Sequence, residues 1–382
     1  MSAHETEARK GAALGAWLRG AWDVVVLEAK QRLRSRGWYI MLAVWFVVIG
    51  LVTWLTWASW NAQRELNRAI SSPDGVVTDL PPESAGPGSM IFEVVLAFVL
   101  FLALIVAPAL SANAVNGDRA QGTLAVVQAT LLSPGQILAG KLAAAWLAAL
   151  AFLAAAAPFL VIGVALGGMS PATIAVSLLM LAVELAVVCS IGVGVSALAG
   201  RPLFSIVVTY LIVALLVVGT LIAFGFGAAL ARGTIRANNP SYLENIPTRP
   251  QAQIVDPGYT CSGPLTQREV VRTERVAWFL AMNPYVVVAD AIPYPDRSRD
   301  TSPYPQGAIE SVSQGARAAL AGPDATYPCV NGQPKPSYFV QTTPLWPLGL
   351  GLQLVLAGGL FAAARSRLVT PARRLSKGTR VA

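Results

Sequence analysis

Six long stretches of this sequence are almost free of charged residues, and each is long enough to cross a bilayer as a helix. They comprise residues 38–60, 90–113, 137–166, 172–199, 204–230 and 344–364. About 20 apolar residues in a helix cross a hydrocarbon core, and a helix satisfies its own backbone hydrogen bonds there. Only 13% of all residues are charged, which is about half the usual share in a soluble domain. The sequence therefore predicts an all-α polytopic membrane protein with six transmembrane helices.

Positive charge in the connecting segments predicts the orientation. Six spans place both termini on one side of the membrane. Seven Lys or Arg residues precede Trp38 and six lie in the basic tail 365–382, whereas the short loops on the other side hold only Arg64 and Arg68. Short cytoplasmic segments are enriched in positive charge. We therefore expect a multi-pass protein of the plasma membrane with both termini in the cytoplasm.

The N-terminal segment 1–37 contains the pattern of a one-sided helix over residues 14–36. Apolar positions recur there at intervals of three and four residues, and most basic side chains lie off that face. Trp17 and Trp22 suit the headgroup layer. We expect an amphipathic helix on the cytoplasmic membrane surface, in contact with membrane lipids, and disorder in residues 1–13. A helix packed on a soluble subunit is the alternative.

The polar segment 231–343 separates the fifth span from the sixth and is expected outside the cytoplasm. Loops longer than about 60 residues are translocated largely regardless of their charge. Within it, residues 276–292 are apolar but short, and Asn283-Pro284 interrupts them. A seventh span would place the basic tail outside. We therefore expect a re-entrant or interfacial helical hairpin, with its bend at or near Asn283 and Pro284.

Two of the three cysteines, Cys261 and Cys329, lie in this outer segment. An oxidising compartment favours a disulfide. The bond would close a loop of about 70 residues and contribute about 4 kcal/mol in the chain-entropy model. Free thiols are the alternative. The sequence has a single His and shows no cluster of His, Cys, Asp and Glu with metal-ligand spacing, so no metal site is predicted.

Residues 107–141 form the one polar break in the first half of the chain that looks ordered. Ser133 can cap a helix, and Pro134 suits the first helical position. Residues 135–142 nearly spell a phosphate-binding loop, but Leu142 stands where Ser or Thr would hold magnesium, and no strand precedes the segment. We therefore predict no nucleotide binding here. An apolar helix at a cytoplasmic membrane boundary calls instead for a partner protein.

Three motifs occur in order across this element: Asp118-Arg119-x-x-Gly122-Thr123-Leu124, Leu131-Leu132-Ser133-Pro134 and Gly140-Lys141. Their order, spacing and place between the second and third spans resemble the E-R-E-x-G-T-L, L-L-x-x-P and G-K signature of ABC-2 type transporter permeases. The N-terminal helix, the six spans and the Asn-Pro hairpin fit the same family. Two positions depart from it. Asp118 stands where the family usually has Glu, and Ala120 replaces a second acidic residue that could form a salt bridge to an ATPase.

The resemblance implies that segment 113–136 is a coupling helix, which sits in a groove of a separate cytoplasmic ATPase subunit. The helix at 14–36 would be the second contact. The residues expected at this docking surface are Asp118, Arg119, Gly122, Thr123, Leu124, Leu132, Ser133, Pro134, Lys141, Trp17 and Trp22. The chain itself would be no enzyme and would bind no cofactor, because ATP and Mg²⁺ would belong to the ATPase. A second permease copy, identical or related, would complete the transporter, and no nucleic acid is expected to bind.

Glu184 lies near the middle of the fourth span. Ionisable groups at that depth are costly and usually face a cavity or a polar partner. Glu184 could line a substrate path or bind a proton, or it could be hydrogen-bonded inside the bundle for packing alone.

The function that we expect is the permease subunit of an exporter for an amphipathic or lipid-like substrate. One alternative is a membrane enzyme that acts on lipid-linked substrates, but the sequence lacks the cluster of Asp, Glu or His that such chemistry needs at one membrane face. The other is a membrane-anchored ligand-binding or scaffold protein, which would need no coupling element.

Overall fold

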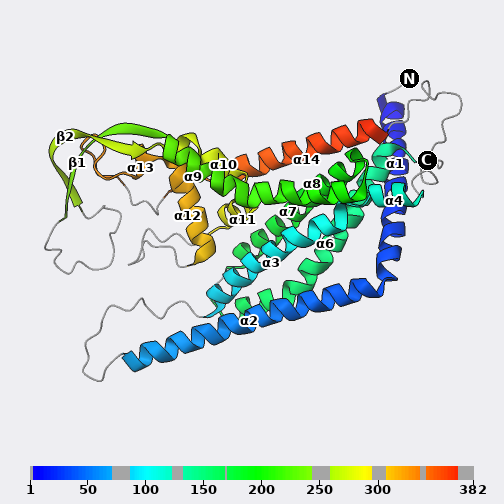
Figure 1. The fold of residues 1–382 in the computed structure, drawn as a ribbon, viewed down its shortest axis with the longest axis horizontal. Coiled ribbons are helices and arrows are strands. Elements are labelled where there is room, and N and C mark those ends of the chain that lie inside the picture. The colour runs from blue at the N-terminus through cyan, green and yellow to red at the C-terminus, as the bar shows by residue number, and fades with distance from the viewer. Residues whose placement is uncertain are drawn as a thin grey trace.

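The computed structural model describes residues 3–70, 87–122, 132–167, 170–242, 259–294, 307–335 and 341–368. Within these ranges the chain is mostly helical, and six helices are long and apolar enough to cross a membrane, as the sequence predicts. They form an elongated bundle (Figure 1). Its spans are α2 (Arg36–Ile70), α3 (Pro87–Ser111), α6 (Pro134–Ala165), α7 (Pro171–Leu198), a fifth built from α8 (Pro202–Ala214), η1 (Leu215–Gly219) and α9 (Thr220–Leu230), and α14 (Trp346–Leu368).

The centre of the bundle is formed by α3, α6 and α7, which pack on one another. Aromatic rings join α2 to this centre, because Trp38 and Trp45 both meet Phe152 of α6 edge-on, with ring centroids 5.2 and 5.1 Å apart. Small residues allow the closest approaches. A Cβ at Gly192 of α7 would overlap the hydroxyl group of Ser111 at the end of α3. The small residues of α7 therefore serve packing within the chain here.

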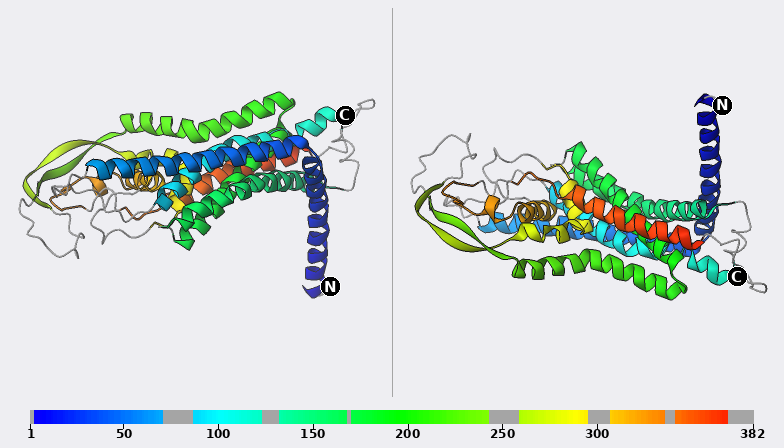
Figure 2. Two further views of the ribbon diagram at one scale, coloured as in Figure 1. Left: turned by 90° about the horizontal axis from the view of Figure 1, so that it is seen from below. Right: turned by 90° about the horizontal axis from the view of Figure 1, so that it is seen from above.

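Helix α1 (Ala3–Leu33) lies crosswise to the spans at one end of the bundle (Figures 1 and 2). It begins at Ala3, so the predicted disorder of residues 1–13 and the predicted start at residue 14 are wrong for this part of the chain. Helix α1 packs on α6 through Ala21 and Val24, which are buried. A Cβ at Gly140 of α6 would collide with both of them, so glycine permits this close crossing.

Two short helices, α10 (Ala277–Ala281) and α11 (Pro284–Ala291), occupy the short apolar stretch before the last span. Asn283 separates them and caps α11 by accepting a hydrogen bond from the backbone N–H of Tyr285 at 2.9 Å. Its amide group also donates to the carbonyl of Val217 at 2.8 Å and to the hydroxyl of Thr220 at 3.0 Å. Val217 lies in the π-helical turn η1, where the wider spacing leaves a carbonyl available. The break at Asn283 and Pro284 is thus held against the fifth span.

The all-α prediction is wrong at the end of the bundle opposite α1. Strands β1 (Arg232–Tyr242) and β2 (Tyr259–Val271) form a two-stranded antiparallel ribbon, with an irregularity between Ala237 and Asn239. We call this the ribbon end. The side chains of β2 are mostly exposed, so the strand lacks the alternating apolar pattern by which strands are predicted. Pro240 is tolerated near the end of β1, beyond the bridge by which Ala237 pairs with Val330 on the other edge of the strand.

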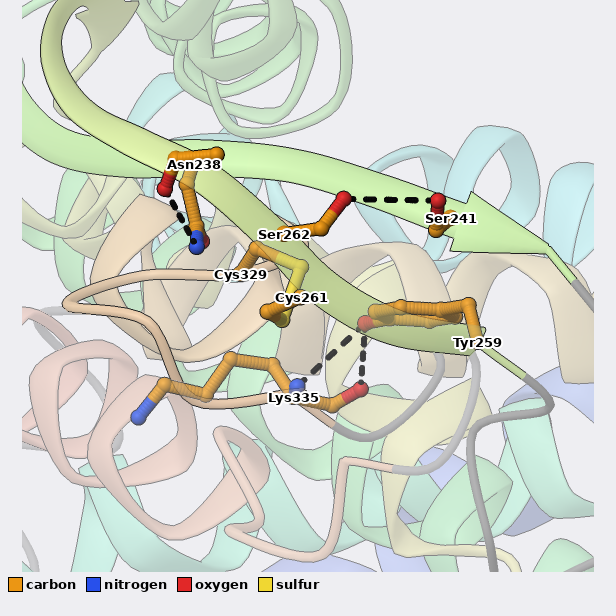
Figure 3. The surroundings of a disulfide bond; sticks show 8 residues. Asn238, Ser241, Tyr259, Cys261, Ser262, Cys329 and Lys335 are labelled. Atoms are coloured by element: carbon orange, nitrogen blue, oxygen red, sulfur yellow. Dashed lines mark hydrogen bonds between the residues drawn. A yellow bond between two sulfur atoms is a disulfide. The ribbon is translucent and has the colours of Figure 1, made fainter.

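A disulfide bond ties the ribbon to the segment that follows α13 (Pro323–Thr326). Cys261 of β2 bonds to Cys329, and their Cα atoms lie 5.4 Å apart (Figure 3). The neighbouring Tyr259 hydroxyl donates to the carbonyl of Lys335 at 2.9 Å and accepts from its backbone N–H at 3.2 Å. This is the pairing that the sequence analysis favoured over free thiols.

A buried carboxylate, Asp290 of α11, anchors the ribbon end to the bundle. It accepts hydrogen bonds from Ser313 and Arg317 of α12 (Ala308–Ala321), at 3.0 and 2.5 Å. It also accepts from the backbone N–H groups of Leu345 and Trp346 at the start of α14, at 2.5 and 2.8 Å. One side chain that is 1% exposed therefore joins three helices and satisfies free donors at a helix N-terminus.

Candidate functional site

The candidate site is the end of the bundle where α1, the short helix α4 (Asn116–Gln121) and the start of α6 meet. Helix α4 ends at Gly122, which adopts the left-handed conformation with φ 74°. Glycine is the residue that takes this conformation without strain. Thr123 and Leu124, two of the expected docking residues, lie outside the described residues. The exposed tip of α4 consists of Ala120, Gln121 and Gly122.

Arg119, another of the expected docking residues, points inward to the bundle. Its guanidinium group donates to the side-chain carbonyl of Asn116 at 2.9 Å and to the backbone carbonyl of Ala199 at 2.8 Å. A longer bond of 3.5 Å reaches the carbonyl of Ala197. These carbonyls lie at the C-terminal end of α7, where backbone acceptors lack partners and the helix dipole favours a cation. Arg119 therefore fastens α4 to the end of α7.

The start of α4 is fixed to α7 by a second contact. The hydroxyl oxygen of Ser196 accepts from the backbone N–H groups of Val115 and Asn116, at 3.0 and 3.1 Å. Ser205 at the start of α8 donates to the carbonyl of Ala112 at 2.7 Å. Ser196 and Ser205 are fully buried. Because each bond satisfies a backbone group that the end of a helix leaves unpaired, α4 is held rigidly to α7 and α8.

Lys141, another of the expected docking residues, is an internal residue of the chain. Its side chain is 3% exposed, and its ammonium nitrogen lies 2.6 Å from a carboxylate oxygen of Glu28 and 2.6 Å from one of Asp118. The cation of α6 thus joins α1 to α4. A buried ammonium group is costly unless it is paired, and two carboxylates supply the pairing. Asp118, 29% exposed, likewise serves this cluster.

Sequence reasoning missed Glu28, Ser196 and Asn116 in this cluster. Glu28 lies seven residues after Ala21 and four after Val24, on the stripe of α1 that packs on α6. A single acidic residue on a buried apolar stripe indicates a buried cation on the facing helix. That signal was available in the sequence. Nothing comparable distinguishes Ser196 from the other small residues of α7, because its role depends on the tertiary contact.

The start of α6 has the predicted cap. The Ser133 hydroxyl accepts from the backbone N–H of Gln136 at 3.4 Å, and the Gln136 side chain accepts from the backbone N–H of Ser133 at 2.7 Å. This is a capping box with Pro134 at the first helical position. The Gln136 amide also donates to the carbonyl of Trp17 at 3.1 Å, and Leu132 lies close to Gly20. The cap therefore fixes α1 against α6, and Ser133 remains exposed.

Helix α1 carries two apolar stripes rather than one. The first packs on α6. The second, formed by Leu14, Leu18 and Trp22 at intervals of four residues, is exposed, with Trp22 at 60%. Trp17 lies between the two stripes and is 37% exposed. Its backbone carbonyl accepts a hydrogen bond from the Gln136 side chain. The exposed stripe can meet either lipid or a partner protein.

Arg32 connects the last turn of α1 to the bundle. Its guanidinium group donates to the carbonyl of Leu110 in α3 at 3.1 Å. Burial lowers the pKa of Arg32 from its ordinary value, and the nearby carboxylate of Glu28 opposes that effect. The helix C-terminus that accepts this bond favours a cation, so α1 is attached at both ends of its packed stripe.

A second polar site lies inside the bundle at Glu184 of α7, which is 1% exposed. Neither carboxylate oxygen has a hydrogen-bond partner among the described residues. Gln353 of α14 is its polar neighbour, and the Gln353 amide donates to the carbonyl of Met282 at 3.1 Å, in the break between α10 and α11. The carbonyl oxygen of Gln353 also has no partner among the described residues. Glu184 is therefore enclosed between α7 and α14 in this conformation.

Comparison with known protein families decides the assignment of this architecture. The family model that is described as "ABC-2 family transporter protein" matches residues 22–328 of the chain. The chain belongs to the ABC-2 transporter family. As an ABC-2 permease, it is the multi-pass membrane subunit of an ABC transporter and not itself the ATPase, and its family implies a partner subunit that binds ATP. No curated protein matches the chain. In the part of this permease that the structure describes, no three His, Cys, Asp or Glu side chains are grouped so that they could hold a metal ion.

Proposed function

We propose that this permease receives its ATPase subunit at the exposed tip of α4 and on the exposed stripe of α1. The observation that carries the proposal is the way in which α4 is held. Its inner residues Arg119 and Asn116 are bonded to α7 and α8, and its outer residues Ala120 and Gln121 are left exposed. Such a helix is a rigid projection, which is what a coupling element needs to transmit motion.

Movement of the α4 tip would be transmitted to several spans together. Arg119 and Ser196 connect α4 to α7, and Lys141 connects it to α6 and α1. A displacement at the tip therefore moves packed helices as units, because close-packed interfaces shift between arrangements rather than deform continuously. In this proposal ATP and Mg²⁺ bind to the partner subunit, and closure of two such subunits moves two permease copies, identical or related.

The membrane orientation follows from α1 and its charges. Helix α1 lies crosswise to the spans (Figure 2), as a helix in the headgroup layer would. Its exposed stripe of Leu14, Leu18 and Trp22 suits that layer, and Arg34 and Arg36 follow at its end. Positive charge favours the cytoplasmic side, so both termini lie in the cytoplasm and the ribbon end lies outside. The break at Asn283 and Pro284 is then a re-entrant hairpin that enters the bundle from the outer side.

We infer export as the direction and an amphipathic or lipid-like molecule as the substrate. The described spans expose large apolar side chains over much of their surface, and Glu184 and Gln353 are the polar pair enclosed between α7 and α14. A molecule with an apolar chain can move along such a surface without desolvating many polar groups of the protein.

Co-purification of the permease with its ATPase tests the proposal. Ala120→Trp places a bulky ring on the exposed α4 tip, and we expect it to abolish capture of the ATPase. Arg119→Ala removes one of the two contacts that hold α4 to α7, and we expect it to retain capture but weaken the coupling of ATP hydrolysis to transport. Gln63→Trp is the matched control, because Gln63 is an exposed residue near the C-terminal end of α2. Normal capture and coupled hydrolysis in Ala120→Trp would show that docking occurs elsewhere.

A further inference from the structure

The ribbon end contains a groove that the ATPase-driven machinery does not explain. Its volume is about 470 Å³, which is in the range of pockets that bind small molecules. The fifth span and the external helices line it together. The residues that define it are Leu221 and Phe224 of α9, Leu280 of α10, Val286 of α11, and Val312 and Ala316 of α12.

The walls of the groove are mostly apolar, although Thr273, Ser311 and Thr326 contribute three hydroxyl groups to the lining. The hydroxyl of Ser311 donates to the carbonyl of Gly307 at 2.7 Å, and that of Thr326 donates to the carbonyl of Gly322 at 2.9 Å. Two of the three hydroxyl groups therefore donate to backbone of the same helix or its cap, and the third belongs to Thr273. Leu221 and Val312 are 51% and 38% exposed. The groove thus offers apolar surface and few polar groups to an occupant.

The depth of the groove relative to the membrane indicates what occupies it. Arg201 precedes the fifth span and marks one membrane boundary. Leu221 and Phe224 lie 19 and 22 residues after Pro202, which corresponds to about 29 and 33 Å along a helix. A hydrocarbon core is about 30 Å thick. The groove therefore begins at the opposite membrane boundary, where one end of an occupant is in lipid and the other is in water.

Helix α9 presents apolar side chains to the groove through Leu221 and Phe224, and apolar side chains also cover its opposite face. Ile222, Phe226 and Leu230 of this helix are exposed by 53, 72 and 86%. Leu221 both lines the groove and is 51% exposed, so an acyl chain that lies against α9 can reach the groove over this apolar side chain. A soluble polar ligand would have no such route and would find few hydrogen-bond partners.

Gly315 supports the same conclusion independently. It lies in the interior of α12 and lines the groove, and a Cβ built there would meet no atom within 4 Å. Glycine in a helix interior costs about 1 kcal/mol relative to alanine, and here no close packing requires it. The absence of a side chain at this position keeps the groove open.

We propose that this groove binds an acyl chain of a membrane lipid from the leaflet at the ribbon end. The apolar chain lies between α9 and α12, and the headgroup stays in the water layer. The inference rests on the membrane orientation proposed above, but it does not require the ATPase. It assigns to the external part of the permease a site that receives lipid at the membrane surface.

Photolabelling of the full chain in nanodiscs, without ATPase, tests this site. The probe is phosphatidylcholine with a diazirine at the end of one acyl chain, in trace amount in unlabelled phosphatidylcholine. We expect mass spectrometry to find label on α12 at Val312 and Ala316, which lie outside the six spans. Gly315→Phe places a ring in the groove from a position where a Cβ meets no atom within 4 Å, and it should reduce that label about tenfold or more. Gly225→Phe, which replaces an exposed glycine of α9 with open space around it, should leave it unchanged.

Two readouts make the result decisive. An intact bond between Cys261 and Cys329 in each variant shows that the ribbon end is folded. Absence of label on α12 in the wild type, or undiminished label in Gly315→Phe, would overturn the proposal. A crosslink between two copies at Val312 would also overturn it, because the occupant would then be a second copy. Failure here leaves ATPase capture by the α4 tip untouched, so the two proposals can fail separately.

Discussion

Two buried carboxyl groups in this permease have opposite surroundings, although each is 1% exposed. Asp290 of α11 accepts from two side chains of α12 and from two backbone N–H groups at the start of α14. Glu184 of α7 has no hydrogen-bond partner among the described residues. A buried carboxylate stabilises a fold only when its acceptor capacity is satisfied. Asp290 therefore stabilises the packing of three helices. Burial of Glu184 without a partner instead costs free energy of folding, and packing alone does not explain why the residue is there.

Replacement of Asp290 should give the largest effect. Asp290→Asn puts an N–H donor where two backbone N–H groups now donate, and it leaves Arg317 without its carboxylate. We expect the free energy of unfolding to fall by about 3–5 kcal/mol, measured by titration with SDS in mixed micelles. The loss should be concentrated at the ribbon end, since α12 and α14 lose their common anchor. A loss below about 1 kcal/mol would show that the four bonds are not formed in solution.

Lys141→Met should have an intermediate effect, because the cluster at the α4 end is partly exposed. The substitution leaves Glu28 and Asp118 without their cation, but their side chains are 16% and 29% exposed and water can reach them. We expect a loss of about 2 kcal/mol. Adding Glu28→Gln and Asp118→Asn should recover part of it, because the unpaired charges are then removed. If the triple variant is no more stable than Lys141→Met, the three residues do not act as one cluster.

Arg119→Ala should cost less still, about 1–2 kcal/mol, because water can replace the guanidinium group at the end of α7. The more informative measurement is amide hydrogen exchange in α4. We expect faster exchange at Ala120 and Gln121 in the variant, since α4 is no longer held by Ala199. Unchanged exchange would indicate that Ser196 alone holds the helix. Ser196→Ala is the matched comparison, and the two variants together should release α4 more than either does.

The contrast between these sites also shows what the sequence could predict. The six spans, the Ser133 cap and the break at Asn283 follow from local patterns of apolar residues, capping residues and proline, and the structure contains them. The inward orientation of Arg119 and Lys141 does not follow, because it depends on helices brought together by tertiary packing. The motif that resembles the family signature therefore includes residues that fasten α4 to the rest of the bundle.

The ribbon was missed for a related reason. The alternation of buried apolar residues in β1 extends over Ile235 and Ala237, and the strand also contains Pro240. So short a pattern, together with a proline, does not indicate a strand from the sequence. Its support comes from the segment around Cys329, far away in the sequence, through the disulfide, backbone hydrogen bonds and the packing of Val330 on Ile235 and Ala237. Where a segment is stabilised by contacts with a distant part of the chain rather than by a repeating apolar face, local patterns carry little information.

Glu184→Gln should produce the smallest change in stability and the most informative change in function. Glutamine keeps the volume, removes the ionisable group and can donate to the unpaired carbonyl oxygen of Gln353. We expect the free energy of unfolding to stay the same or to rise by about 1 kcal/mol. A carboxyl group kept for packing would leave transport unchanged in this variant. One that binds a proton or contacts substrate during the transport cycle would reduce transport while ATPase capture stays normal. A clear loss of stability would instead mean that Glu184 has a partner, and the contrast with Asp290 would disappear.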